Sequence, residues 1–540
     1  MRKLFGVIFI LILVTGLIFS SCAQPAAPTA TPAPVPAPGP APAPAPTPAP
    51  TPTAPAAPAQ PAVQYGGILK IITSDLPNNI GYPPKMDATG MSRSMMWAER
   101  LMDVAPNGDL IPVLAESWDF GSDGLSITFH LRKGVKFHDG TDFNADAVKW
   151  NYTEDMKTGA VPDARYIKSI DVLDPYTIRF SLTKPNSHII YDIWRPWMIS
   201  PTAVTQNGAD WAITHAVTTA PFKVVDFQTG VSMKLEKFAG YWRPGRPYMD
   251  GIEIKTVKEP STAAMLIQAG QADMWLLATQ QEASDLRGKG FPVLVGTSTF
   301  NNIYPDSLNA KSPFADKKVR EAVEYAIDRK AMSGALGFGF TTPLDQLAPP
   351  NTSGYNPAYP ARAFNPAKAK QLLAEAGYPN GFSTSMELTS TALNMGTAIK
   401  NYLGDIGIKV ELNVLDLGKY YANQFTAGWT GLHLGVIAVS PEYSVAFIHH
   451  LGPEPDVKFA SLAKTPEFLN SVEATMAAKD IATMRTLTRA MVTQGSLDAI
   501  AIPVYTNPAL TITGPTVMST YTKEVYWTGW RISDDWIKQK

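Results

Sequence analysis

The chain has 540 residues, 47 prolines, one cysteine and a formal charge of −1. This length exceeds one ordinary hydrophobic core and predicts two or three domains, while an apolar fraction of 45% excludes wholesale disorder. A net charge near zero argues against a nucleic-acid binder. A single cysteine excludes an intrachain disulfide and a cysteine-based zinc site.

The N-terminus has the pattern of a secretory signal peptide, which we place at residues 1–21. Arg2 and Lys3 precede a mostly apolar stretch from Leu4 to Phe19, which is too short to span ~30 Å of hydrocarbon. Two serines and then Cys22, the only cysteine, resemble a bacterial lipobox, although a phenylalanine stands where that motif usually has leucine. The resemblance implies lipidation of Cys22; an uncleaved signal anchor is the alternative.

Residues 22–63 are predicted to be a lipid-anchored tether. Sixteen of the 47 prolines lie between Ala23 and Val63, and no charged residue occurs from Leu4 to Leu69. Alternating proline excludes helix and sheet ladders and favours extended polyproline II. A proline-rich ligand for another module is the alternative interpretation.

The remaining chain mixes strands and helices, which predicts an α/β or α+β fold. Strands are expected at 68–72, 126–132, 177–182, 231–235, 251–257 and 409–414. Helices are expected at 262–269, capped by Ser261, and at 316–331, where apolar residues recur every three or four positions. Arg320 is expected on the polar side of the second of these helices, paired with an acid. A further helix should begin with Asn365 as its cap and Pro366 as its first residue, and end at Gly377.

Five stretches, in order along the chain, resemble the large solute-binding proteins of ABC importers, in the oligopeptide, dipeptide and nickel branch (family 5). The second of them reads Phe-His-Leu-Arg-Lys-Gly-Val-Lys-Phe-His-Asp-Gly-Thr. The stretches lie at 108–118, 129–148, 240–273, 312–329 and 369–382. The resemblance covers roughly Gly66 to the C-terminus.

The resemblance implies a type II periplasmic-binding-protein-like fold, with two lobes joined by two hinge crossings and an extra inserted domain. By analogy, lobe I comprises 65–110, 205–305 and 505–540, the extra domain 111–204, and lobe II 306–504. The ligand is expected between the lobes, which close around it.

The expected pocket lacks the charges of peptide-binding relatives. In those proteins an acid pairs with the ligand amine, and an ungapped alignment places Ser440 at that position and Leu434 at the position of an arginine. A buried ammonium without an acid costs several kcal/mol, so a neutral or mostly apolar ligand is favoured. Glu442 takes over the acid's role if the loop is shifted.

The other candidate ligand contacts are aromatic or polar residues that follow a strand, lie near the expected lobe crossing or flank the uncharged stretch, and each has packing as its alternative role. They are Trp275, Tyr304, Asn309, Trp429, His433 and Tyr443. The stretch from Thr218 to Ala220 lacks two glycines that relatives usually have, which predicts a different loop path near the cleft.

No catalytic motif, cofactor loop or metal-ligand spacing is recognisable, so we expect no enzyme activity, no cofactor and no metal. The expected function is capture of a peptide-class or other small organic solute and its delivery to ABC permease and ATPase subunits. The expected protein is a monomer, lipid-anchored to the outer face of the cytoplasmic membrane. Two alternatives stay open: a nickel or metallophore binder using His433, His449 and His450, and a surface adhesion or signalling lipoprotein.

Overall fold

A computed structural model describes residues 62–105, 107–159, 161–440, 442–452, 459–519 and 530–538. The predicted signal peptide, Cys22 and nearly all of the tether lie outside these residues. Residues 62–540 form one compact unit. No helix within the described ranges is long and apolar enough to cross a membrane.

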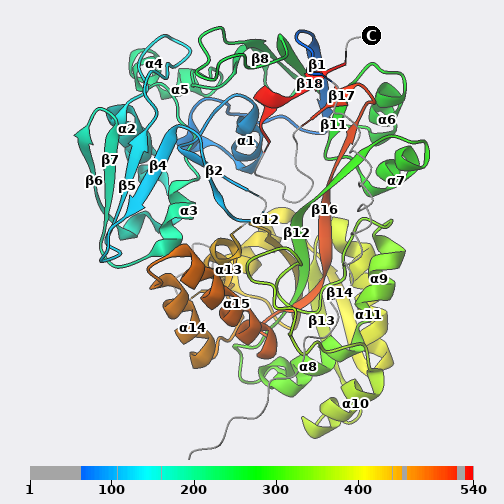
Figure 1. The fold of residues 1–540 in the computed structure, drawn as a ribbon. Helices are drawn as coiled ribbons and strands as arrows, with labels where there is room; N and C mark the ends of the chain where they lie inside the picture. Colours follow the sequence, from blue (N-terminus) through cyan, green and yellow to red (C-terminus); the bar gives the residue numbers. More distant parts are fainter. Residues whose placement is uncertain are drawn as a thin grey trace, which may run out of the picture. The chain divides into compact units, whose positions relative to one another are not determined.

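A ten-stranded sheet dominates the fold (Figure 1), in the order β14-β13-β15-β12-β16-β11-β1-β10-β9-β8. One half contains β1 (Ile68–Thr73), β8 (Phe222–Gln228), β9 (Ser232–Lys237), β10 (Gly251–Thr256) and β11 (Met274–Leu276). The other half contains β13 (Phe382–Leu388), β14 (Ile408–Val414) and β15 (Leu432–Ala438). The expected strands at 68–72, 251–257 and 409–414 are therefore confirmed within a residue or so at either end, and the one expected at 177–182 is confirmed in a separate sheet described below.

Two long central strands join the halves, β12 (Val293–Pro305) and β16 (Ile502–Thr513). They are antiparallel to each other, while β16 also pairs with β11 and β12 also pairs with β15. The β12–β16 ladder therefore links the two halves of the sheet, since β15 belongs to one half and β11 to the other. The β12–β16 ladder shifts register between Thr297 and Thr299 and again between Phe300 and Asn302.

The Asn507 side chain bridges these irregularities. Its amide nitrogen lies 2.9 Å from Thr299 Oγ1, and its amide oxygen lies 2.7 Å from Asn301 Nδ2.

Helices cover both halves of the sheet. The half that carries β13–β15 buries one face of α8 (Lys317–Ala326), α9 (Arg329–Leu336), α10 (Pro366–Glu375) and α11 (Leu393–Asp405). The other half is covered by α6 (Pro260–Gln268) and α7 (Gln280–Gly288). Further helices are α12 (Leu417–Ala422), α13 (Tyr443–Leu451), α14 (Pro466–Met476) and α15 (Ile481–Leu497).

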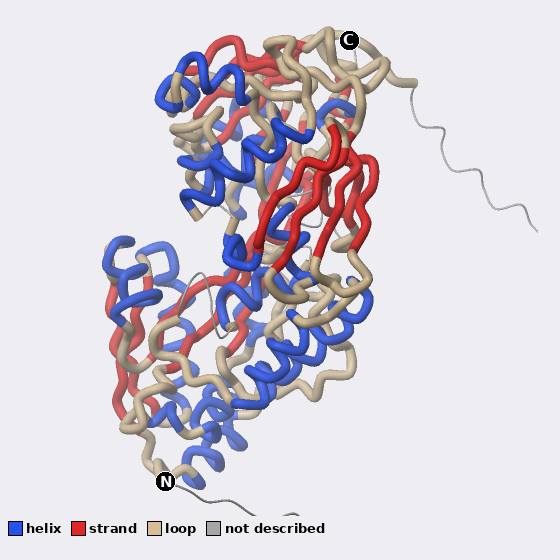
Figure 2. Tube along the Cα trace, turned by 90° about the vertical axis from the view of Figure 1, so that its left-hand side faces the viewer, coloured by secondary structure: helices blue, strands red, loops and turns tan. Residues whose placement is uncertain are grey.

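A separate four-stranded sheet, β4-β5-β7-β6, lies inside the predicted extra domain, on the left of Figure 1 and toward the viewer in Figure 2. Its strands are β4 (Ala115–Phe120), β5 (Ser126–Leu131), β6 (Ile167–Asp174) and β7 (Thr177–Leu182), and α2 (Ala145–Thr158) packs on it. Its buried side chains form one continuous hydrophobic cluster with those of α13, α14 and α15. The exact domain boundaries stay a prediction.

Three local expectations are wrong. Helix α6 begins at Pro260, not after a Ser261 cap, because proline is favoured at the first helical position. The single helix expected over 316–331 is two helices: Ile327 is extended, and the Asp328 side chain accepts a hydrogen bond from the Ala331 amide to cap α9. Arg320, expected on the polar face beside an acid, is buried and donates to four backbone carbonyls.

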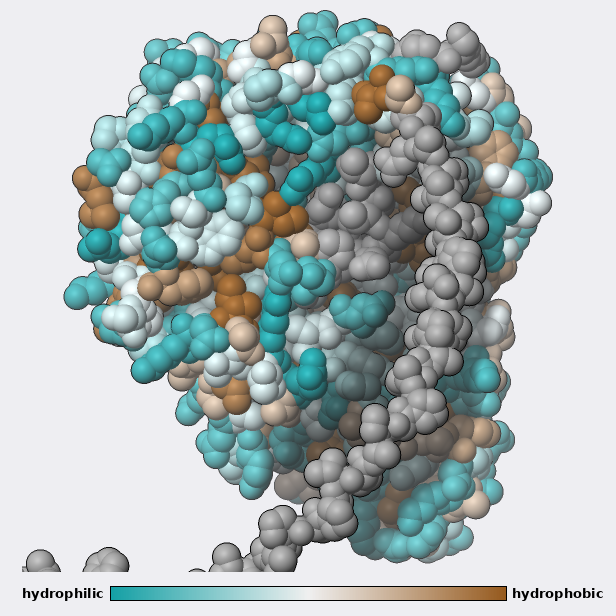
Figure 3. Space-filling model, viewed as in Figure 1, coloured by the Kyte–Doolittle hydropathy of each residue, from teal (hydrophilic) through white to brown (hydrophobic). Residues whose placement is uncertain are grey.

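The expected helix after Asn365 is confirmed. The Asn365 side chain accepts a hydrogen bond from the Lys368 amide, Pro366 is the first helical residue, and Gly377 follows the end with a φ of +90°. Hydrophilic side chains cover most of the face seen in Figure 3, with hydrophobic ones in separate patches, as is ordinary for a surface in water.

Candidate functional site

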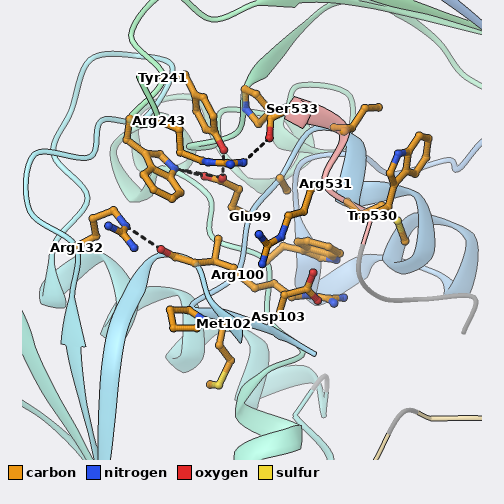
Figure 4. A pocket seen from close by; sticks show the side chains of 18 residues that line it. Glu99, Arg100, Met102, Asp103, Arg132, Tyr241, Arg243, Trp530, Arg531 and Ser533 are labelled. Carbon is orange, nitrogen blue, oxygen red and sulfur yellow. Dashed lines mark hydrogen bonds between the residues drawn. The ribbon is translucent and has the colours of Figure 1, made fainter. Parts of the chain in front are cut away.

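A cavity of about 310 Å³ lies where four segments meet (Figure 4). They are the short strands β2 (Met102–Val104) and β3 (Leu110–Pro112), the Tyr241–Arg243 turn and the 3-10 helix η8 (Ile532–Asp534). The cavity is lined by aromatic side chains, four arginines and two acids. The charged members are Glu99, Arg100, Asp103, Arg132, Arg243 and Arg531.

Glu99 is the central acid of this cavity and is held by three hydrogen-bond donors. Tyr241 Oη lies 2.8 Å from Glu99 Oε1, and the Trp242 Nε1 and Thr219 Oγ1 atoms lie 3.0 and 2.8 Å from Oε2. Burial raises the pKa of Glu99 to about 7, although the three donors and Arg243 act in the opposite direction. The charge of the cavity therefore changes near neutral pH.

Arg100 brings a buried positive charge to the cavity. Its guanidinium carbon lies 3.6 Å from the ring centroid of Trp197 and 4.3 Å from that of Trp194. Burial lowers the pKa of Arg100 to about 9, so the group stays charged at neutral pH. Its Nε is buried and makes no hydrogen bond within the described part of the chain.

The other arginines that the cavity exposes are braced by neighbouring groups. The Arg132 guanidinium lies 4.4 Å from the Trp242 ring and 3.2 Å from Glu116, and Arg243 donates to Ser533 and pairs with Asp534. Guanidinium groups held in fixed positions recognise carboxylates well. Because Arg132 and Arg243 are already paired with acids, the capacity of the cavity for an acidic group rests on Arg100, whose Nε makes no hydrogen bond to the described residues.

The raised pKa of Glu99 predicts a pH-dependent stability. A raised folded-state pKa contributes stability that is complete below the unfolded value of 4.5 and is lost as pH rises through about 7. Relative to a Glu99→Gln variant, the wild type should lose about 3 kcal/mol between pH 4.5 and pH 8. Urea unfolding of both proteins across this range measures the difference. A difference that does not change with pH, or that changes in the opposite direction, contradicts the prediction.

The structure brings three of the sequence-predicted residues together in the other half of the molecule. The Tyr304, Trp429 and His433 rings have centroids 5.1–6.5 Å apart, and Trp429 Nε1 donates to the Tyr304 carbonyl at 3.0 Å. All three side chains are at most 5% exposed. Contact with a ligand therefore requires a different conformation from the one described.

His433 has both ring nitrogens beside acceptors. Its Nδ1 lies 3.3 Å from Glu387 Oε2 and its Nε2 lies 3.2 Å from Gln424 Oε1. His450 Nδ1 faces the Ala446 carbonyl at 2.6 Å, whereas His449 lies 3.6 Å from Asp192. The three histidines considered for nickel thus have separate partners and do not converge.

The other predicted contacts lie apart. Trp275 is buried under α6 and α7, and Tyr443 is buried with its hydroxyl bonded to the Leu347 carbonyl. Asn309 is exposed in the turn after β12, where its side chain accepts from the Lys311 amide. Ser440 is half-buried after β15. Of the seven predicted ligand contacts, Asn309 and Ser440 are the two with appreciable exposed surface.

Glu442, the alternative acid for a peptide amine, is already paired with other side chains of the protein. It is buried, lies 3.0 Å from Arg485 Nε, accepts a hydrogen bond from Ser353 at 2.7 Å, and caps α13. Arg485 also reaches Asp109 at 2.8 Å, which links α15 to the turn between β2 and β3. A ligand amine therefore finds no free carboxylate at Glu442.

Sequence analysis did not single out Glu99, Arg100 or Arg485. Glu99 and Tyr241 are 142 residues apart, and Arg485 and Asp109 are 376 residues apart, so no local period links them. The one available signal was that Tyr241 and Trp242 belong to a stretch that carries the family resemblance.

Comparisons with known proteins extend the resemblance. Residues 109–448 match the family described as bacterial extracellular solute-binding proteins, family 5 Middle. The glutathione-binding proteins GsiB of Pectobacterium atrosepticum and Shigella flexneri are 35% and 36% identical over 323 and 318 residues, which is 57% of this chain in each case. The matched region spans only 62% and 61% of these relatives' own length.

Solved structures share the fold at lower identity. DppA of Helicobacter pylori in complex with the peptide STSA has a TM-score of 0.72 at 22% identity, covering 88% of this chain and 99% of its own. NikA of Brucella suis in complex with Fe(III)-EDTA has a TM-score of 0.75 at 21% identity, covering 87% and 100%. CtaP of Listeria monocytogenes has a TM-score of 0.77 at 17% identity, covering 88% and 100%. The mixed α/β, type II binding-protein architecture expected from the sequence is confirmed.

Proposed function

Because this chain belongs to family 5 of the bacterial extracellular solute-binding proteins, we propose that it captures a small organic solute outside the cytoplasmic membrane and delivers it to an ABC importer. The single observation that carries the proposal is the family match over residues 109–448. The two crossing strands β12 and β16 support it, because two halves joined in this way can close around a ligand. The chain acts by reversible binding, as a monomer, and not as an enzyme.

The side chains at the junction between the two halves of the sheet favour a ligand that has no free amine, because the described residues offer no free carboxylate there to pair with one. Ser440 stands at the position of the acid in peptide-binding relatives, and Glu442 is engaged by Arg485 and Ser353. A bound ammonium would therefore be left without a partner, at a cost of several kcal/mol. In this proposal Ser440 contacts the ligand directly. Asn309 follows Pro305, at the opposite end of the β12–β15 ladder from Ser440, so it does not contact the same small solute. The other five predicted residues reach it only after rearrangement.

Mass spectrometry of the molecule retained by purified residues 63–540 tests the function directly. We expect one small organic solute in near-stoichiometric amount, released on denaturation, and loss of its uptake when the gene is deleted. A chain that retains nothing, together with unchanged uptake of every solute tested in the deletion strain, would contradict solute delivery.

A substitution at Ser440 tests the predicted ligand chemistry. Ser440→Asp should tighten the binding of zwitterionic di- to pentapeptides by at least about 10-fold, because a charge-assisted hydrogen bond contributes about 1.5–3 kcal/mol. Isothermal titration measures the affinity, and Ala438→Asp, at the last residue of the preceding strand β15, is the matched control. Micromolar binding of these peptides by the wild type would contradict the claim that the site disfavours a ligand amine, but it would not contradict solute delivery.

We also propose that Cys22 carries the lipid anchor and that residues 22–63 hold the binding unit away from the membrane. Several acyl chains at ~0.8 kcal/mol per buried CH₂ make such anchoring effectively permanent. Cys22→Ala should therefore move the protein from the membrane fraction to the medium or periplasm, as measured by immunoblotting of fractionated cells. Ser21→Ala, which keeps a small residue before the cysteine, should remain membrane-bound. Unchanged partitioning of Cys22→Ala would end the proposal.

A further inference from the structure

Four potential metal ligands meet at the contact between the predicted extra domain and helix α13. They are Asp163 from the 3-10 helix η3 (Pro162–Tyr166), His188 from the 3-10 helix η4 (Ser187–Ile189), Asp192 from α3 (Ile190–Ile193), and His449 from α13. One ligand atom of each lies within 4.8 Å of the others. The exposed fractions of the four residues are 1%, 0%, 0% and 7%, so the cluster is buried.

The spacing of these atoms is too long for hydrogen bonds. His188 Nε2 lies 3.5 Å from Asp192 Oδ2 and 3.8 Å from Asp163 Oδ2, and His449 Nε2 lies 3.6 Å from Asp192 Oδ2. A hydrogen bond would bring such atoms to about 2.7–3.2 Å. Two ligands of a tetrahedral Zn²⁺ at about 2.0–2.1 Å from the ion are about 3.3–3.4 Å apart. The observed separations are closer to the distance between two ligands of a tetrahedral Zn²⁺ than to a hydrogen-bond distance.

Two of the side chains are buried without hydrogen bonds. Neither ring nitrogen of His188 and neither carboxylate oxygen of Asp192 makes a hydrogen bond to the described residues. Buried polar groups of this kind cost about 1–3 kcal/mol each, and more when charged, unless something satisfies them. Of these atoms, His188 Nε2 and Asp192 Oδ2 lie beside each other and face Asp163 and His449.

The surroundings suit an ion. Asp163 is positioned by Arg165, 3.1 Å from its Oδ1, and by Asn186, 3.4 Å from its Oδ2. A neighbouring cavity of about 360 Å³, lined by Asp163 and His449, gives an ion a path to the cluster. Two carboxylates and two neutral imidazoles balance the charge of one divalent cation.

We propose that Asp163, His188, Asp192 and His449 bind one Zn²⁺ ion in a closed structural site. Two nitrogen and two oxygen ligands select Zn²⁺ over Ca²⁺ and Mg²⁺, which prefer oxygen alone, and four protein ligands leave no open position for catalysis. The ion fastens α13 to the segment from 163 to 192. This site is separate from solute capture, so either proposal can fail without the other.

The test is Zn²⁺ binding by the full chain after removal of metals with a chelator. Competition with a chromophoric chelator should give one tightly bound Zn²⁺ per chain, and Co²⁺ substitution should give the intense visible absorption of a tetrahedral site. His449→Ala and Asp192→Asn should each weaken binding by at least about 10-fold. His450→Ala, one residue along the same helix but outside the cluster, should bind as the wild type does.

Three outcomes overturn the site: a folded wild type that binds no stoichiometric Zn²⁺, full binding by both His449→Ala and Asp192→Asn, or an equal loss in His450→Ala. Circular dichroism shows whether each variant is folded. If Asp192→Asn does not fold, Asp163→Asn at the edge of the cavity replaces it, with the same expected loss. The surface histidines His130 and His215 are present in every variant, so adventitious binding is subtracted.

Discussion

Replacing Arg362 with leucine should lower the free energy of unfolding by about 3–5 kcal/mol. Arg362 lies 2.7 Å from Glu324 and 2.9 Å from Glu321, and it donates to the Ser496 and Leu497 carbonyls at the end of α15. Its loss leaves the Glu324 carboxylate, which is 1% exposed, without its hydrogen-bonded cation.

Among the described residues, Arg329 stays near Glu324 as a cation but does not replace the hydrogen bond that Arg362 donates. The nearest other cation, Arg329, lies 3.4 Å from Glu324, and its Nη2 makes no hydrogen bond to the described residues. The matched control is Lys318→Ala, which breaks an ion pair whose partners are 48% and 40% exposed and should cost at most about 1 kcal/mol. Denaturant unfolding compares the two, and equal losses for both variants would contradict the argument.

The second large effect is expected at Arg485. Arg485→Met should cost roughly 3 kcal/mol, because it leaves the buried Glu442 carboxylate without the guanidinium 3.0 Å away. Asp109→Ala removes only the exposed end of the same network and should cost less than about 1 kcal/mol. The difference between the two variants isolates the burial of Glu442.

A double variant gives the decisive measurement for this network. Arg485→Met combined with Glu442→Gln removes the uncompensated charge and should recover most of the lost stability. Thermal and urea unfolding of the four proteins complete the cycle. A double variant as unstable as the sum of the two single variants would show that Arg485 and Glu442 do not act as a pair.

Local chemistry explains which parts of the fold could be predicted. The helix after Asn365 has a cap, a proline and a terminal glycine, all signals within a dozen residues, and its structure agrees. The segment from 316 to 331 has apolar residues at helical spacing throughout. Even so, the Asp328 side chain caps the start of a second helix, which interrupts the first. Periodicity alone carries no information about that interruption.

The candidate sites were mostly beyond the reach of sequence reasoning. Tyr304, Trp429 and His433 were expected only as separate candidate ligand contacts. Tyr304 and His433 meet because they pair across β12 and β15, which the sequence did not predict. Glu99 depends on donors more than 100 residues away, and Asp163 meets His449 only through the packing of two separate parts of the chain. Such tertiary contacts leave no periodic trace in a single sequence.

The pairing of β12 with β16 determines the mechanics of opening. Since β12 and β16 are hydrogen-bonded to each other, they form one two-stranded ribbon. They cannot rotate independently, as two unpaired linkers could. The register shifts at Thr297–Thr299 and Phe300–Asn302 concentrate twist and leave residues unpaired, so the ribbon is most compliant there. In the proposed closure around a solute, the stiffness of this ribbon would set the population of open and closed forms, and side chains such as Asn507 would influence affinity without touching the solute.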